Sequence, residues 1–586
     1  MIKDPIYQYD LFDDGKVIHN KKKEKLPAMG WNSWNAFGSG NTENLTKAMA
    51  DALVSLGLDK LGYRYVVLDD GCYKPERVDG KLSNEEKKFP SGFKALSDYV
   101  HGKGLKFGMY NDIGTNLCAG AAVGTCGHER VDAKTYVDWG VDFLKVDNCY
   151  YLWDNATFSD PANVKYVYAP NIKGIRIEGN GISSEYSAIK QGVLVGNRIE
   201  KTSDYITKIG TFDGTGPEHT PIGMQSGELH FEIDVPCDGE YYLSVCYATG
   251  EEEGVGSLLQ VAVMGSETLA FDDYLDVTDD KEAFIWSKNI PVCLNKGKNI
   301  IRLMNHRRQE NTLGSYGTLL KELNEYAPEN DIIFSACEWG KTQPQNWAYK
   351  VADSWRILND ITFQVGADGN PGNGKWNSDY TTSVVAQYNK AVIMDEFSGL
   401  SKGWNDPDML MIGMNGLDST MCKTHMTMWC MMNAPLMLGL DLRRVSVGDD
   451  IYNIIANKNV IDLNQDPLGV QAKRIYCSMV EISPDTEYVT DEDRVDILAK
   501  PLADGSVAIS FINVSQNKMT GAFSVTKDRI LEKIGAKMVQ RESFEVATKY
   551  EVEDLWSESK WEAEGAVFAV NELNGCDNVT LKVKPL

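Results

Sequence analysis

A short apolar run in the middle of the chain is followed at once by polar and charged residues. Residues 141–144 are mostly apolar and predict a buried strand, and Lys145, Asp147, Asn148 and Cys149 come directly after it. Barrel enzymes carry their catalytic groups at the carboxyl ends of such strands. We therefore expect Asp147 to be a catalytic nucleophile. An Asp that ends a strand and caps the next turn is the alternative that this segment leaves open.

The same alternation of apolar strand, polar strand end and helix covers the first part of the chain and returns later. The expected strands include Met29–Phe37, which runs into a Gly-rich turn, Tyr65–Cys72, Lys106–Asp112, Ile332–Trp339, Gly403–Leu410 and Ala434–Leu438. The expected helices include Thr42–Leu56, Phe93–Leu105, Ala133–Trp139, Tyr316–Leu323, His425–Met432 and Asp449–Asn457. This order predicts an α/β fold, a (β/α)8 TIM barrel.

Two other parts of the chain show alternating, strand-like patterns instead. Residues 163–313 contain runs such as Tyr241–Tyr247 and no convincing helix, which predicts an all-β sandwich inserted into the barrel. The chain from residue 473 is again strand-like and predicts a small antiparallel domain. The expected order is barrel 1–162, inserted sandwich 163–313, barrel 314–472 and C-terminal β-sandwich 473–586.

Composition narrows the classes of partner. The formal net charge of −25 disfavours nucleic acid and anionic membranes, and no apolar run is long enough to cross a bilayer. Met1–Pro5 has neither the basic nor the apolar part of a leader, so we expect a cytoplasmic protein, or a secreted one whose leader was removed. The 12 Cys and 7 His form no metal-binding pattern, so no metal or cofactor is expected. A homo-oligomer stays open.

Nine motifs, taken in order, resemble glycoside hydrolase family 27, the α-galactosidase and α-N-acetylgalactosaminidase group. They are Met29-Gly30-Trp31 with Trp34, Leu68-Asp69-Asp70-Gly71-Cys72, Gly108 to Gly114, Cys118-Ala119-Gly120, Trp139 to Cys149, Cys337-Glu338-Trp339-Gly340, Ser354-Trp355-Arg356 with Asp360, Trp404 to Leu410, and Asn464 to Gly469.

The resemblance implies a retaining glycosidase with two catalytic acids. The nucleophile falls on Asp147, in a Lys-x-Asp-x-Cys motif, and the general acid/base falls on Asp360, four residues after Arg356. The nucleophile must be ionised, which the neighbouring Lys145 favours, and the acid must carry a proton. From the residues alone, an ordinary i, i+4 helix ion pair is the commoner interpretation of Arg356 and Asp360.

The family also implies the sugar contacts. Asp69 is expected at the galactose 6-hydroxyl and Asp70 at the axial 4-hydroxyl, and Lys145 at the 3- and 4-hydroxyls. The remaining expected contacts are Arg356 and Glu338 near the 2-hydroxyl, Trp34 and Met409 as apolar walls, Tyr110 beside the nucleophile, Asp408 at the rim or supporting Arg356, and Cys337 and Trp339 in the binding site. A disulfide between Cys118 and Cys149 is implied too, and a reducing cytoplasm would oppose it.

The substrate preference follows from two of these positions. Family members that accept N-acetylgalactosamine have a small residue at the position of Glu338, and those that act on β-L-arabinopyranosides alter the position of Asp69. Terminal α-linked galactose in oligosaccharides or glycoconjugates is therefore expected. The alternatives are α-N-acetylgalactosaminidase, β-L-arabinopyranosidase and a non-catalytic glycan-binding protein. Residues 341–346 depart from the family and leave the aglycone side undefined.

The inserted sandwich weakly resembles carbohydrate-binding modules of family 35. Trp286, Phe284 and Tyr274 are candidates to stack on a sugar, although core packing is the commoner use of each. A structural or dimerising role for this domain is equally open.

Overall fold

The computed structural model describes residues 25–149, 166–168, 170–195, 199–209, 228–249, 255–266, 268–305, 307–328, 331–378, 382–479 and 488–586. Residues Met1–Pro5, on which the leader prediction depends, lie outside this set. In the described residues no helix is both long enough and apolar enough to span a membrane.

Eight parallel strands form a closed barrel. In spatial order they are β20 (Trp404–Asp406), β19 (Ser354–Arg356), β18 (Ile333–Cys337), β4 (Phe143–Asp147), β3 (Lys106–Asp112), β2 (Tyr65–Val67), β1 (Met29–Asn32) and β21 (Leu436–Leu438). A parallel bridge between Leu410, just after β20, and Leu438 of β21 joins the two edges. The predicted TIM barrel is thus confirmed.

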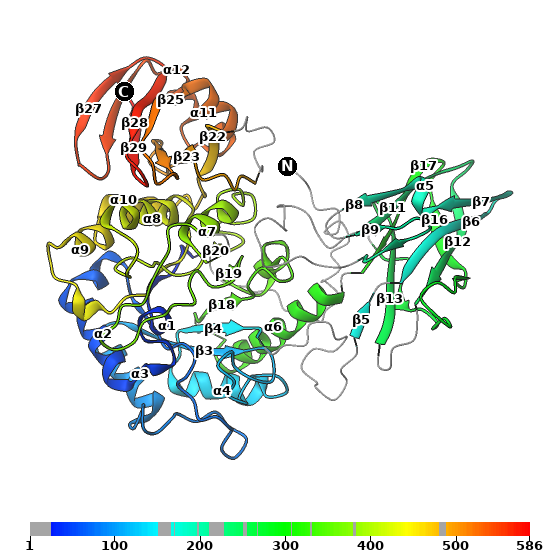
Figure 1. The fold of residues 1–586 in the computed structure, drawn as a ribbon, viewed down its shortest axis with the longest axis horizontal. Helices are drawn as coiled ribbons and strands as arrows, with labels where there is room; N and C mark the ends of the chain where they lie inside the picture. The colour runs from blue at the N-terminus through cyan, green and yellow to red at the C-terminus, as the bar shows by residue number, and fades with distance from the viewer. Residues whose placement is uncertain are drawn as a thin grey trace.

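Helices connect and surround these strands (Figure 1). They include α1 (Ser33–Phe37), α2 (Glu43–Ser55), α3 (Gly92–Gly102), α4 (Glu129–Trp139), α6 (Arg307–Tyr326), α7 (Val384–Ala391), α8 (Ser419–Met431), α9 (Asp450–Ile455) and α10 (Lys458–Asn464). Helix α2 begins where the Thr42 side chain accepts a hydrogen bond from the Leu45 amide, and Leu45, Met49 and Leu53 face the core.

The chain leaves the barrel between β4 and β18 to form two sheets whose strands pair antiparallel, except that β5 (Tyr166–Tyr168) pairs with β13 (Val255–Val263) in parallel. One contains β15 (Ile285–Trp286), β12 (Gly239–Ala248), β6 (Asn171–Gly179), β10 (Ile206–Thr207), β9 (Glu200–Lys201), β16 (Ile290–Leu294) and β7 (Ile182–Ser187). The other contains β14 (Phe271–Tyr274), β13 (Val255–Val263), β17 (Gly297–Met304), β11 (Glu228–Val235), β8 (Gly192–Val195) and β5 (Tyr166–Tyr168). A core of alternate apolar residues lies between the sheets, including Ile175, Phe231, Leu243 and Val261.

A third antiparallel unit follows the barrel (Figure 1). Its main sheet is ordered β22 (Lys473–Cys477), β23 (Val495–Pro501), β24 (Val507–Asn513), β29 (Asn578–Pro585), β26 (Lys549–Asp554) and β27 (Lys560–Glu564). The strands β25 (Met519–Thr526) and β28 (Val567–Leu573) pair with each other, and α11 (Lys527–Ile534) and α12 (Arg541–Val546) complete the unit.

The element boundaries differ from the sequence predictions in a few places. Helix α4 begins at Glu129, about one turn earlier than expected, and α8 begins at Ser419, nearly two turns earlier. Their first turns carry polar residues that the apolar spacing does not mark. Residues 163–313 contain the one-turn helix α5 (Ala188–Gln191) and the beginning of α6, where no helix was expected. The outermost parts of these elements are polar, so periodicity alone gives little signal there.

Candidate active site

The predicted site residues gather at the carboxyl ends of the barrel strands. In the strand register Tyr110 lies opposite Lys145, and Asp112 and Cys337 lie opposite Asp147 on either side of β4. Parallel pairing brings the ends of β3, β4 and β18 together at the same mouth of the barrel.

Asp147 is the last residue of β4 and is almost wholly buried, with 4% of its surface exposed. Its Oδ1 accepts a hydrogen bond from the Asn148 amide at 2.9 Å, and its Oδ2 accepts one from the Tyr110 hydroxyl at 3.0 Å. Burial raises the pKa of Asp147, while the positive charges of Lys145 and Lys341 lower it. The expected effect of Lys145 on the nucleophile is present, but burial outweighs it.

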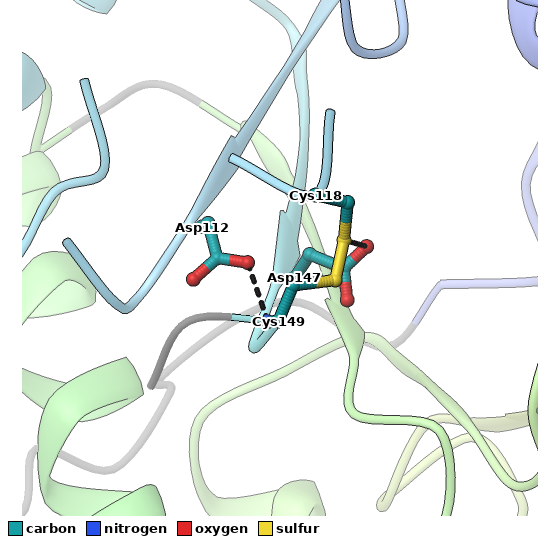
Figure 2. Close-up of side chains that lie close together, drawn as sticks. All are labelled: Asp112, Cys118, Asp147 and Cys149. Carbon is teal, nitrogen blue, oxygen red and sulfur yellow. Dashed lines mark hydrogen bonds between the residues drawn. A yellow bond between two sulfur atoms is a disulfide. The ribbon is translucent and has the colours of Figure 1, made fainter. Parts of the chain in front are cut away.

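A disulfide between Cys118 and Cys149 lies beside this carboxylate (Figure 2), which confirms the predicted pairing. The Cα atoms are 5.2 Å apart, and Cys118 Sγ is 3.3 Å from Asp147 Oδ2. On the other side, the buried Asp112 accepts a hydrogen bond from the Cys149 amide at 2.6 Å. The donor atoms of these four side chains lie within 4.8 Å of one another. Because the two sulfurs are bonded to each other, they offer no thiolate to a metal in this state.

The acid pair after β2 is held by fixed partners. Asp69 Oδ2 accepts hydrogen bonds from Lys145 Nζ and Asn32 Nδ2, each at 2.8 Å. Asp70 Oδ2 accepts one from the Ala119 amide at 2.7 Å, and burial raises its pKa to about 6. These partners fix the two carboxylates, which are 4% and 2% exposed, toward the barrel mouth.

Asp360 lies in the segment after β19, and its side chain keeps 20% of its surface exposed. Arg356 ends β19 and makes ion pairs with Asp360 at 3.2 Å and with Asp408 at 3.1 Å. Because Arg356 is in a strand and Asp360 in a loop, the alternative of a helix ion pair is wrong. Asp408 also accepts a hydrogen bond from the Ile361 amide at 2.7 Å, which fixes the turn that carries Asp360.

Burial raises the pKa of Asp360 to about 6, against the lowering effect of Arg356, and the negative charges of Asp408 and Asp147 raise it further. Asp147 ends β4 and Asp360 follows β19, and because both strands belong to the same parallel sheet, the two acids lie at the same mouth of the barrel. Two carboxylates that share a site and differ in their surroundings are the arrangement that a retaining glycosidase needs.

Glu338 follows β18 and is completely buried. Its Oε1 accepts hydrogen bonds from the Thr342 amide at 2.8 Å and the Thr342 hydroxyl at 2.7 Å, whereas its Oε2 has no partner among the described residues. Burial raises the pKa of Glu338 to about 8, so the group carries its proton at neutral pH. Cys337 is buried against Arg356, with Sγ 3.7 Å from Nη1, and Trp339 has a positive φ of 61°.

The predicted apolar walls belong to one cluster. Met409 is buried with Val67, Phe143, Ile333 and Met437, and Trp34 packs against this cluster while remaining half-buried. An apolar surface beside fixed carboxylates suits the face of a sugar ring.

Three residues at the nucleophile were not among the predicted site residues. They are Asp112, Asn148 and Lys341. Asp112 and Asn148 lie inside quoted motifs, so their neighbours gave a signal for them. Lys341 lies in the segment where the sequence departs from the family, and only the structure places it there, with Nζ 3.0 Å from Asn148 Oδ1.

Two of the three candidate stacking residues between β4 and β18, Trp286 and Phe284, make cation–π contacts. The Arg176 guanidinium lies 4.1 Å from the ring centre of Trp286, which is 37% exposed, and Lys173 Nζ lies 5.0 Å from that of Phe284. Tyr274 is half-buried at the edge strand β14. The ring of Trp286 is thus already in contact with Arg176.

Two family models match the chain. The model described as alpha galactosidase A matches residues 26–177 and 305–466, and that of the alpha galactosidase C-terminal beta sandwich domain matches residues 492–583. The first of these alone covers more than half of the chain. The chain belongs to glycoside hydrolase family 27, the α-galactosidases. The first family match omits residues 178–304, and the described strands from β7 to β17 fall within this gap.

Individual members of family 27 resemble the chain along most of its length. The α-galactosidase of Cyamopsis tetragonoloba is 28% identical over 85% of this chain and 74% of its own. The structure of α-galactosidase I from Mortierella vinacea has a TM-score of 0.58 and 22% identity, covering 96% of this chain and 98% of its own. The structure of the Saccharomyces cerevisiae α-galactosidase with raffinose has a TM-score of 0.58 and 20% identity over the same shares. These two structures show the shared fold.

Proposed function

We propose that this protein is a retaining exo-glycosidase that hydrolyses terminal α-linked galactose from oligosaccharides or glycoconjugates. The observation that carries the proposal is the pair Asp147 and Asp360, which lie at the end of β4 and after β19, at one barrel mouth, in opposite settings. Asp147 is fixed and almost fully buried, while Asp360 is partly exposed with a pKa raised to about 6. The names of the relatives support the choice of galactose, as does the yeast enzyme solved with raffinose.

The reaction proceeds by double displacement. Asp147 attacks the anomeric carbon while Asp360 gives its proton to the departing oxygen, and a covalent galactosyl ester forms. Asp360, now ionised, takes a proton from water, which attacks the ester and releases galactose with its original configuration.

Selectivity for galactose follows from the groups around the ring. Asp69, Asp70 and Lys145 form one hydrogen-bonded array that takes the hydroxyls at carbons 3, 4 and 6. Glu338 fills the space beside carbon 2, and its protonated Oε2 is a donor to a 2-hydroxyl. An acetamido group would have to displace this buried side chain.

The test is a comparison of p-nitrophenyl α-galactoside, α-N-acetylgalactosaminide and β-L-arabinopyranoside, with proton NMR of the first sugar released. We expect the α-galactoside to be hydrolysed best and α-galactose to appear first. Binding of galactose without turnover of any substrate would instead identify a glycan-binding protein. Release of β-galactose first would contradict the retaining mechanism.

A further inference from the structure

Lys341 is joined to the residue that follows the nucleophile. Its Nζ donates hydrogen bonds to the backbone oxygen of Asn148 at 3.1 Å and to the Asn148 Oδ1 at 3.0 Å. Asn148 in turn donates its amide N–H to Asp147 Oδ1 at 2.9 Å. The Lys341 ammonium group, from the segment after β18, thus binds both the backbone oxygen and the side-chain oxygen of Asn148. Asn148 is the residue whose amide contacts Asp147.

The other two cations at the barrel mouth are already paired with carboxylates. Lys145 lies 2.8 Å from Asp69, and Arg356 is shared by Asp408 and Asp360. Within the described part of the chain, Lys341 makes no salt bridge, and its hydrogen bonds go to the uncharged Asn148. Its positive charge is therefore not neutralised by a direct partner and acts on the acids around it.

Three buried acids surround this charge. Asp112, Asp147 and Glu338 each have a pKa raised by burial, and in each case Lys341 lowers it. Asp112 and Asp147 are also register partners on neighbouring strands, so the site concentrates negative charge where one carboxylate must be ionised to react. Lys341, which makes no salt bridge among the described residues, lowers the electrostatic cost of ionising that carboxylate.

The turn that carries Lys341 is tightly built. Trp339, Gly340 and Gln343 have positive φ values of 61°, 72° and 55°, and the Lys341 amide donates a hydrogen bond to the Glu338 oxygen at 3.2 Å. The ammonium lies 4.9 Å from the ring centre of Trp339. These contacts direct the lysine toward Asn148 before any sugar is bound.

We propose that Lys341 is a positioning residue for the nucleophile: it fixes Asn148 and, together with Lys145, keeps Asp147 ionised. The inference rests on the proposed function, because it assigns the nucleophile to Asp147. It gives a role to the segment where this chain departs from the family pattern.

Asp147 is faced by charged or titratable groups from every neighbouring element. They are Lys145 on β4, Tyr110 and Asp112 on β3, Asp70 after β2, Tyr316 on α6, Cys337 and Lys341 at and after β18, and Arg356 and Asp360 at and after β19. Among the positively charged groups of this set, Lys341 is the one that has no assigned sugar contact, so its removal leaves those contacts in place.

The experiment measures kcat/KM against pH for dinitrophenyl α-galactoside, whose leaving group needs little help from Asp360. The acid limb then reports the ionisation of Asp147 in the free enzyme. We expect Lys341→Met to move this limb up by about one pH unit, which is roughly a tenfold loss on the acid side. Lys341→Arg should restore at least half of the shift. Lys134→Met, which removes an exposed lysine on α4, should leave the limb unchanged.

An unmoved acid limb in Lys341→Met would overturn the inference. If that variant does not fold in a thermal melt, Lys341→Gln replaces it with the same expected shift. A wild-type enzyme without turnover would contradict the proposed function instead. In that case we measure by mass spectrometry how the labelling of Asp147 by a galactose-configured cyclitol epoxide depends on pH. Labelling requires attack by Asp147 but does not require turnover, so it tests the role of Lys341 separately.

Discussion

The ends of β4 and β19 each lead into one of the two proposed catalytic acids, but they hold these acids differently. Asp147 is the last residue of its strand, is 4% exposed, and accepts hydrogen bonds from the Tyr110 hydroxyl and the Asn148 amide. The Cys118–Cys149 disulfide lies beside it. Asp360 lies beyond its strand, keeps a fifth of its side chain exposed, and shares Arg356 with Asp408. One acid is fixed and the other is reachable by water.

This difference matches the two tasks. A nucleophile must stay ionised and stand at one fixed distance from the anomeric carbon, so rigidity and nearby cations serve it. A group that gives and takes a proton in turn needs contact with water and a pKa near the working pH. The following experiments test the contrast, beginning with the largest expected effect.

Replacing Asp147 by Ala should abolish turnover, with a loss of at least about 10⁴-fold in kcat for every α-galactoside. Azide should partly rescue the variant and give β-galactosyl azide, because the small anion attacks from the vacated face. The exposed Asp98→Ala serves as the control with unchanged rate. Wild-type turnover in Asp147→Ala would remove the nucleophile assignment.

Replacing Asp360 by Asn should depend on the leaving group. Natural galactosides need a proton on the departing oxygen, so we expect a loss of about 10³-fold with raffinose. With dinitrophenyl α-galactoside, the dinitrophenolate group leaves without that proton, so the rate of the first step should fall far less. Steady-state rates and burst kinetics on both substrates separate the cases. Equal losses on the two substrates would contradict the acid role of Asp360.

The basic limb of the pH profile should report Asp360. Because its pKa is raised to about 6, the protonated form persists up to that pH, and kcat/KM for raffinose should fall about tenfold per pH unit above it. Asp408 raises this pKa, so Asp408→Asn should move the limb to lower pH and leave the acid limb in place. A basic limb that moves up in Asp408→Asn would show that the two acids are not coupled in this way.

The sequence was sufficient for the barrel because several strands have an apolar run with polar residues at the carboxyl end, as in Phe143–Asp147. It was also sufficient to predict that Asp147 and Asp360 follow barrel strands, because both lie in recognisable motifs, while their catalytic roles stay predictions. It could not show that Arg356 is divided between two carboxylates, nor that Lys341 reaches back to Asn148. The Arg356–Asp408 and Lys341–Asn148 contacts each join two different strand ends, and neither pair has a local spacing that would reveal it. The Arg356–Asp360 contact, by contrast, is visible in the sequence as an i, i+4 spacing.

Removal of the Cys118–Cys149 disulfide is the change from which we expect the smallest effect on kcat. Cys118→Ser with Cys149→Ser frees the end of β4 from the loop after β3, so Asp147 should lose part of its fixed position while Asp360 is untouched. We expect a loss of about two- to tenfold in kcat with a basic limb unchanged. The sequence separation of 31 residues implies that the disulfide contributes up to about 3–4 kcal/mol to the free energy of unfolding.

The matched control is Cys126→Ser, since Cys126 lies in the same loop region and forms no disulfide. Treatment of the wild type with a dithiol should reproduce the double variant, in both the lower melting temperature and the lower kcat. If the reduced enzyme keeps full kcat, the covalent tie contributes to folding stability alone. The fixed position of Asp147 would then come from Tyr110, the Asn148 amide and the strand itself, and the contrast with Asp360 would depend on hydrogen bonds and burial.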